Sequence, residues 1–272
     1  MPPLDRNRFV GDPALAATFD KLFDLARQIK MPGEACEALL GLGFTFEVLV
    51  VDDGSTDQTA QLVEEFVHFW PEVRLVRHSE NRGYGAALRS GFEAARFDLI
   101  AFTDADCQFH LEDLDDLVAA TDRNAIAVGV RSYRQDPLLR IFLSWGYNKL
   151  TRFLLGTGVT DLDCALKVFR REALQELLPT SKGFFVNAEM LCRARQFGWR
   201  IAESCVRHRA RRRGKSKVSL REVPRTFKTL FLFWWQHVVR HPATKRPLAE
   251  PNEPKLLPFP SREYLAQPKR AA

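Results

Sequence analysis

Short apolar runs alternate with amphipathic stretches along most of this chain, and no other feature restricts the possible fold as strongly. The run FEVLVV at residues 46–51 is rich in valine, and apolar residues recur at helical spacing after Ser55. Strands are predicted at 46–51, 73–77, 98–103, 125–131, 164–169 and 199–208, and helices at 13–30, 55–69, 83–95, 110–121, 138–155 and 187–198. This alternation predicts an α/β fold, with a mostly parallel sheet and helices on both faces.

Two of the predicted strands end in pairs of acids. Asp52 and Asp53 follow the first strand, and Asp104 and Asp106 follow the third. Such strand ends open into one crevice, where four carboxylates repel one another unless a cation or a polyhydroxyl ligand is present. Either motif alone is commonly a turn or a helix cap. Together they indicate a ligand site, in which Asp106 and Gln108 offer oxygen ligands to Mg²⁺ or Mn²⁺ holding a diphosphate.

The positive charge of the chain is concentrated in one segment. The net charge is +6, and residues 207–217 contain seven Arg and Lys and no acid. Such a segment suits phosphates, nucleic acid or an anionic membrane surface. The segment has no interleaved aromatic residues, and the acidic clusters would repel a polyanion, so a nucleic-acid partner is not expected.

Five motifs in order resemble the family 2 inverting glycosyltransferases over residues 44–220. They read VLVVDDGSTDQT, NRGYGAALRSGFEAA, FTDADCQFHLEDL, VGVR and CALKVFRREAL. The polyprenyl-phosphate sugar synthases, of the dolichol-phosphate mannosyltransferase type, are the most similar subgroup. This resemblance implies a GT-A nucleotide-sugar-binding fold and an enzyme of class EC 2.4. The implied reaction moves a sugar, with inversion, from a GDP- or UDP-linked donor to a dolichyl or undecaprenyl phosphate, assisted by Mg²⁺ or Mn²⁺.

The resemblance also assigns roles to individual positions. Acids of the first motif contact the nucleotide, Asp104 lies near ribose and metal, and basic residues face the phosphates of donor or acceptor. Glu189 is interpreted either as a contact or orienting group for the donor sugar, or as plain helix surface. The residues that the resemblance places at the site are Asp52, Asp53, Asp104, Asp106, Gln108, Arg131, Glu189, Arg211 and Lys217. Asp106 and Gln108 are the implied metal ligands.

A phosphate monoester acceptor is already mostly ionised at neutral pH, so the reaction needs no strong general base. The oxygen of the polyprenyl phosphate would attack the anomeric carbon directly, in a single displacement that inverts the configuration. This is consistent with the lack of a recognisable activated serine, cysteine or histidine motif in the sequence.

The beginning of the chain departs from the family pattern. Relatives open with a strand and a PxYNE-like segment that lines the nucleotide base, and residues 1–43 contain neither. The fold is therefore expected to lack the usual first strand. The alternative hypothesis is a catalytically impaired binding or partner protein that lost donor binding with that strand.

Four regions follow from these observations. They are an atypical helical segment at 1–43, the GT-A domain at 44–222, an amphipathic helix at 223–241 and a proline-rich extended or disordered tail at 242–272. The helix at 223–241 and the aromatic side of 138–155 either pack on the globule or lie in a membrane interface. No signal peptide or membrane span is expected, which predicts a cytoplasmic protein peripheral to an anionic membrane face.

Overall fold

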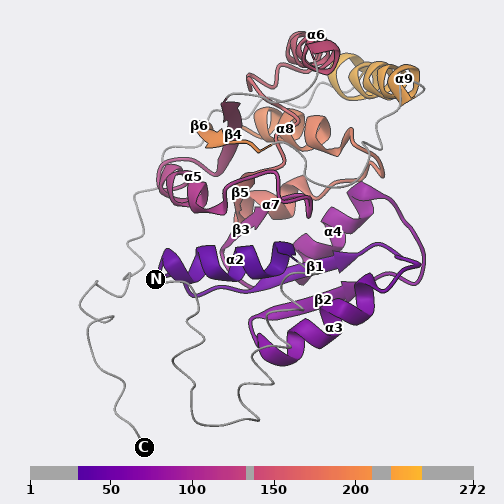
Figure 1. The fold of residues 1–272 in the computed structure, drawn as a ribbon. Coiled ribbons are helices and arrows are strands. Elements are labelled where there is room, and N and C mark those ends of the chain that lie inside the picture. The colour runs from indigo at the N-terminus through magenta and orange to yellow at the C-terminus, as the bar shows by residue number, and fades with distance from the viewer. Residues whose placement is uncertain (1–29, 133–137, 210–221, 241–272) are drawn as a thin grey trace, which may run out of the picture.

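The computed structural model describes residues 30–132, 138–209 and 222–240, and it confirms the α/β class (Figure 1). The strands are β1 Val48–Asp52, β2 Val73–Arg77, β3 Leu99–Phe102, β4 Ile126–Ser132, β5 Lys167–Arg170 and β6 Ile201–Arg207. The helices are α2 Lys30–Gly41, α3 Thr59–Phe69, α4 Tyr84–Ala94, η2 Leu111–Asp113, α5 Leu114–Ala120, α6 Leu138–Leu155, α7 Arg171–Leu177, α8 Val186–Gln196, α9 Glu222–Trp234 and the π-helical η3 Trp235–Arg240. All six predicted strands are present. The predicted helix at 13–30 and the tail from 242 lie outside the described residues.

The strands form two separate sheets rather than one. β1 and β2 pair in parallel, while the second sheet has the order β3-β5-β4-β6. In that sheet β5 runs antiparallel to β3 and β4, and β4 and β6 are parallel. The sheet system is therefore mixed, in contrast to the mostly parallel sheet that the alternation predicts. Within the described ranges no strand joins β1 to β3.

Most of the hydrophobic core belongs to the four-stranded sheet. The first four residues of β4 and the first three of β5 are buried, and α5 packs on both strands. Phe102 of β3 stacks on Phe169 of β5, with the ring centroids 6.2 Å apart. This continuous apolar packing is the main source of stability expected for the domain.

The two-stranded sheet has a small core of its own, centred on Phe66, Val73 and Cys36. Two helices connect this core to the larger one. On α2, Ala35 belongs to the larger core and its neighbour Cys36 to the smaller. On α4, Gly91 faces Val51 of β1, while Phe92 packs on Phe102 of β3 at 5.7 Å. The two sheets are thus joined through helices and loops instead of strand hydrogen bonds.

Helices α6 and α9 lie side by side at the end of the molecule far from β1 and β2 (Figure 1). Tyr147 of α6 meets Phe227 of α9 edge-to-face, with ring centroids 6.5 Å apart. None of the helices in the described part of the chain is long and apolar enough to span a bilayer.

Candidate functional site

The first acidic loop follows β1 and is held in a tight turn. Asp52 is 3% exposed, and its Oδ1 accepts a hydrogen bond from the Ser55 N–H at 3.1 Å. Its Oδ2 is buried and has no hydrogen-bond donor among the described residues. The Nε of Arg77 lies 3.7 Å from this oxygen, beyond hydrogen-bonding distance. One carboxylate oxygen of Asp52 therefore accepts no hydrogen bond from the residues that the structure describes.

Asp53 has a different environment, because the protein saturates its carboxylate. Oδ1 is 2.7 Å from Nδ1 of His78 and accepts the N–H of Arg82 at 2.9 Å, while Oδ2 accepts the N–H of Gly83 at 2.8 Å. Burial raises the pKa of Asp53, but these hydrogen bonds outweigh it and hold the pKa below its ordinary value. Asp53 thus fixes the start of α4 against the end of β1.

The second acidic loop, after β3, is connected to the first through Tyr84. The Tyr84 hydroxyl donates a hydrogen bond to Oδ1 of Asp104 at 3.1 Å. Tyr84 directly follows Gly83, whose N–H is bound by Asp53. The structure therefore brings the acids of both strand ends to one edge, as the sequence predicts.

Asp106 and Gln108 lie in a turn of the same loop. The intervening Cys107 has a left-handed backbone, with φ of 56°, and the N–H of Gln108 donates to Oδ1 of Asp106 at 3.3 Å. The Gln108 side chain donates to the carbonyl of Arg209, and the N–H of Arg209 donates to the Gln108 carbonyl at 2.7 Å. The predicted metal ligands thus lie beside the beginning of the basic segment.

The described part of the basic segment, 207–209, is tied to the loop after β3. Phe109 and His208 form an antiparallel bridge, and Arg207 makes an ion pair with Asp113 at 2.6 Å. The predicted phosphate-binding residues Arg211 and Lys217 lie outside the described residues. Arg209, the last described residue of the basic segment, is hydrogen-bonded to Gln108.

Arg131, predicted to face phosphates, forms a buried ion pair with Asp161. Its Nε and Nη2 donate to the two carboxylate oxygens at 2.7 and 2.6 Å, and each side chain is only 8% exposed. Burial lowers the pKa of Arg131, but the contact with Asp161 outweighs it and raises the pKa above its ordinary value. The guanidinium therefore stays charged, and a phosphate would share it with Asp161.

Glu189 is 1% exposed, so the interpretation as plain helix surface is wrong. Its Oε1 accepts from the N–H and hydroxyl of Thr180, at 2.9 and 2.5 Å, and its Oε2 accepts from the N–H of Ser181 at 2.8 Å. Burial raises the pKa of Glu189, but the lowering by these hydrogen bonds is larger. The pKa of Glu189 is therefore below its ordinary value. Glu189 anchors the loop at 180–183, which in turn contacts the start of α4. A direct contact with a donor sugar stays a prediction.

Sequence reasoning missed Lys167, a fully buried lysine behind the second acidic loop. Its Nζ donates to Asn187 Oδ1 at 2.9 Å, to the Leu162 carbonyl at 3.1 Å and to the Cys164 carbonyl. Burial lowers the pKa of this ammonium, and nearby acids, Asp104 among them, partly oppose that shift. A charged residue inside the otherwise apolar run CALKVF was the available signal, because buried charges require partners.

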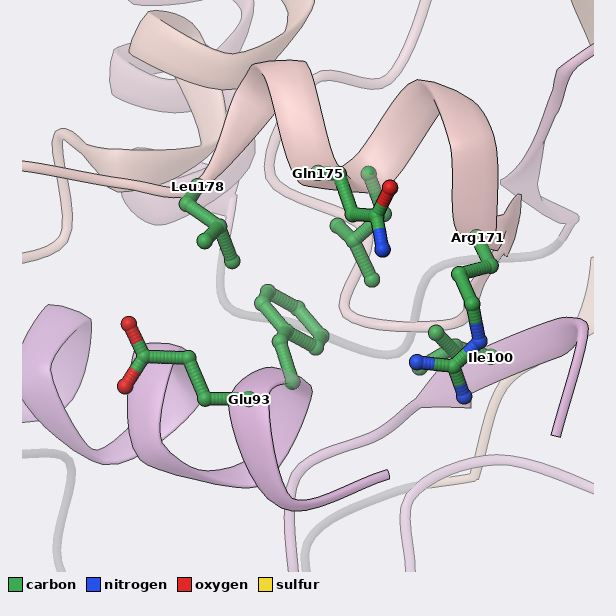
Figure 2. A pocket seen from close by; sticks show the side chains of 7 residues that line it. Glu93, Ile100, Arg171, Gln175 and Leu178 are labelled. Carbon is green, nitrogen blue, oxygen red and sulfur yellow. The ribbon is translucent and has the colours of Figure 1, made fainter. Parts of the chain in front are cut away.

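A cavity of about 230 Å³ lies elsewhere, between α4, β3 and α7 (Figure 2). It is lined by Phe92, Glu93, Ile100, Arg171, Leu174, Gln175 and Leu178. No residue of either acidic loop belongs to this lining. The cavity is therefore separate from the candidate site.

Known proteins share both the sequence pattern and the fold of this chain. Glycosyltransferase AglD of Haloferax volcanii is 33% identical over 211 residues, which cover 74% of this chain and 33% of AglD. Polyprenol monophosphomannose synthase of Mycolicibacterium smegmatis is 32% identical over 185 residues, 63% of this chain and 70% of that protein. This chain thus spans only a third of the length of AglD.

A solved structure of glucosyl-3-phosphoglycerate synthase from Mycobacterium tuberculosis, in complex with Mn²⁺, uridine diphosphate and phosphoglyceric acid, has a TM-score of 0.58. It is 21% identical and covers 75% of this chain and 72% of its own, which supports the GT-A type of fold. Residues 30–178, more than half of the chain, match the profile of Glycosyl transferase family 2. The chain belongs to glycosyl transferase family 2.

Proposed function

We propose that this chain transfers a sugar, with inversion, from a GDP- or UDP-linked donor to a polyprenyl phosphate. The observation that carries the proposal is the meeting of three segments at one edge: the loop after β1, the loop after β3 and the start of the basic segment. Hydrogen bonds through Tyr84 and Arg209 connect them. The donor diphosphate would need acidic residues that hold a metal ion, and the acceptor phosphate would need basic residues, so the two kinds of side chain must lie close together.

The nucleotide would bind beside the first acidic loop. Asp52 Oδ2 is a buried carboxylate oxygen without a hydrogen-bond donor in the described ranges, and leaving it unsatisfied costs free energy. A base N–H or a ribose hydroxyl would supply the missing donor. Asp53 would act by shaping the loop, since its oxygens already accept three hydrogen bonds from the protein.

A divalent cation fits the second acidic loop by its donor chemistry. Asp106 and Gln108 offer hard oxygen ligands within one turn, but the described residues contain no group of three or more His, Cys, Asp or Glu that could hold a metal. Mg²⁺ is commonly bound by one or two carboxylates, with substrate phosphates and water completing the site. Such an ion would supply neutralisation of the departing diphosphate.

The chain's own residues would orient the acceptor and donor for a single displacement. The acceptor phosphate is mostly ionised at neutral pH, so no residue has to remove its proton. Arg211 and Lys217 would hold the acceptor phosphate, since Arg209, two residues before Arg211, is hydrogen-bonded to Gln108. Arg131 would contact a phosphate only by sharing its guanidinium with Asp161, while Glu189 keeps the loop at 180–183 in place.

The acceptor lipid suggests a membrane surface, and α6 and α9 offer an apolar face for it. Among the side chains described on these helices and on η3, the large apolar ones that are exposed are Trp145, Phe153, Phe227, Phe231, Leu232, Trp235 and Val239. Phe153 is 84% exposed, and Lys149 lies over the Trp145 ring at 5.1 Å. Aromatic residues flanked by lysine are typical of helices in an anionic membrane interface. Co-sedimentation with phosphatidylglycerol vesicles, lost in Phe153→Asp with Trp235→Asp, would test this surface.

A second candidate, a binding protein that retains the fold without catalysis, is favoured by the split between β1 and β3 within the described residues. Incubation with radiolabelled UDP- and GDP-sugars, Mn²⁺ and undecaprenyl phosphate separates the two. Labelled lipid that disappears in Asp106→Ala supports the transferase. Neither binding of a nucleotide sugar nor any labelled lipid is expected for the second candidate.

A further inference from the structure

We infer that Tyr84 is a positioning residue that holds Asp104 in its place in the site, and that Asn187 and Lys167 fix the Tyr84 hydroxyl from the protein interior. The inference rests on the proposed function, because it concerns how the same site binds its donor. Sequence reasoning assigned no role to any of these three residues.

Tyr84 is itself firmly placed by contacts on both sides of it. The N–H of Gly83 is bound by Asp53, and the N–H of Gly85 donates to the carbonyl of Lys182 at 2.9 Å. The ring packs against Phe184, with the centroids 5.3 Å apart. With its backbone and ring fixed, the hydroxyl reaches Oδ1 of Asp104 at 3.1 Å.

Behind the hydroxyl, the hydrogen bonds run in one direction from Lys167 to Asp104. An ammonium only donates, so Asn187 accepts from Lys167 through Oδ1, at 2.9 Å. This leaves the amide nitrogen of Asn187 as the group that can donate toward the Tyr84 hydroxyl, and Asn187 partly opposes the rise that burial causes in the pKa of Tyr84. The hydroxyl donates its own proton to Asp104. Each bond in such a chain polarises the next, so the last one is strengthened.

The buried end of the chain is the Lys167 amino group, whose three hydrogen bonds all go to oxygen acceptors. Lys167 is 1% exposed, its other donors are taken by the carbonyls of Leu162 and Cys164, and it lies over the Phe102 ring at 5.3 Å. Phe102 ends β3, two residues before Asp104. The Lys167 charge attracts the Asp104 carboxylate. This attraction offsets the repulsion among acids that would otherwise push the two loops apart.

The Tyr84 hydroxyl gives its single proton to Asp104, so its effect on a bound sugar nucleotide is expected to pass through Asp104. Loss of a hydrogen bond to a charged group is expected to change the affinity about tenfold. Tyr84→Phe removes the hydroxyl and keeps the ring against Phe184. Tyr147→Phe is the matched control, because it removes the hydroxyl of another half-buried tyrosine, which lies on α6.

The test is calorimetric titration of the full chain with UDP and with GDP in the presence of Mn²⁺, extended to millimolar nucleotide. We expect Tyr84→Phe to weaken binding about tenfold and Tyr147→Phe to leave it within twofold. In an Asp104→Asn background, Tyr84→Phe should cost less than twofold, because its partner is already changed. Thermal melting of each variant checks that all of them are folded.

Two results would overturn the inference while the proposed function stands: equal affinities for Tyr84→Phe and Tyr147→Phe, or a tenfold loss that persists in the Asp104→Asn background. The latter would mean that Tyr84 acts on the fold or on the nucleotide directly. If the unmodified protein binds neither nucleotide, the proposed function fails and the inference fails with it.

Discussion

The two sheets that flank the candidate site have hydrophobic cores of very different size. The four-stranded sheet has a large continuous core, whereas the β1–β2 sheet has three fully buried core residues, Cys36, Phe66 and Val73. Small cores give little stability by themselves. The smaller sheet must therefore depend on its attachments: α2, α4 and the loop contacts around Asp53 and Glu189. The residues predicted to act in chemistry thus also hold the two halves together.

The largest expected effect comes from the contact between α4 and the loop at 180–183. A Cβ on Gly85 would lie 1.8 Å from the Ser181 carbonyl oxygen, so Gly85→Ala must displace one segment. We expect a loss of about 3 kcal/mol in the free energy of unfolding, measured by urea denaturation. Gly146→Ala is the control: nothing lies within 4 Å of its added Cβ, and alanine in a helix should stabilise by about 0.5–1 kcal/mol. Equal effects of the two changes would contradict the close junction.

Next in size is the loss of the carboxylate that anchors the same loop from the larger sheet. Glu189→Gln replaces a carboxylate that accepts three hydrogen bonds with an amide. The amide NH₂ group would then point at the backbone N–H of Thr180 or of Ser181, and two donors cannot bind each other. We expect about 2 kcal/mol of destabilisation. Hydrogen exchange should show faster exchange of the amides at 180–185. Unchanged protection there would mean that Glu189 does not fix this loop.

A smaller effect is expected on the other side of the junction. Asp53→Asn keeps the shape of the side chain but weakens its bonds to His78, Arg82 and Gly83, costing about 1 kcal/mol. Amides of β1 and β2 should then exchange faster, while those of β4 and β5 keep their protection. Uniform loss of protection across both sheets would show that the halves unfold as one unit.

The smallest effect is a pH dependence that both anchors predict. The pKa values of Asp53 and Glu189 are lowered in the folded protein. These two carboxylates therefore contribute fully to stability when the pH is above their ordinary pKa values of about 4. This contribution is lost as the pH falls through the lower folded pKa values. Urea denaturation between pH 6 and pH 3 should therefore show a shallower fall for Glu189→Gln than for the unmodified protein. Parallel curves would rule out this contribution.

Local patterns predicted much of the fold, because the spacing of apolar residues within a single segment indicates whether that segment forms a strand or a helix. The valine-rich run before Asp52 and the alternation along the chain were sufficient for the six strands. The direction of β5 was not predictable in this way. Its run CALKVF reads the same in a parallel or an antiparallel ladder, and the neighbours decide between them.

The site was predictable only where its residues stand at strand ends. Asp52, Asp53, Asp104 and Asp106 were proposed by that rule, and their roles stay predictions, while a hydrogen bond from Tyr84 ties Asp104 to the start of α4. The roles of Asp53 and Glu189 as anchors depend on backbone N–H groups 8–30 residues away, which no local pattern encodes. The buried chain from Lys167 to Tyr84 likewise exists only in three dimensions.

The most direct test of the central claim is whether the acidic loops hold a nucleotide together with a divalent ion. UDP and GDP are titrated into the full chain with and without Mn²⁺, and into Asp106→Ala, with the exposed Asp122→Ala as control. The account predicts that Mn²⁺ raises the affinity for one of the nucleotides at least about tenfold in the unmodified protein and in Asp122→Ala. In Asp106→Ala this gain should vanish. Binding that ignores Mn²⁺, or that is unaffected by Asp106→Ala, would contradict the account.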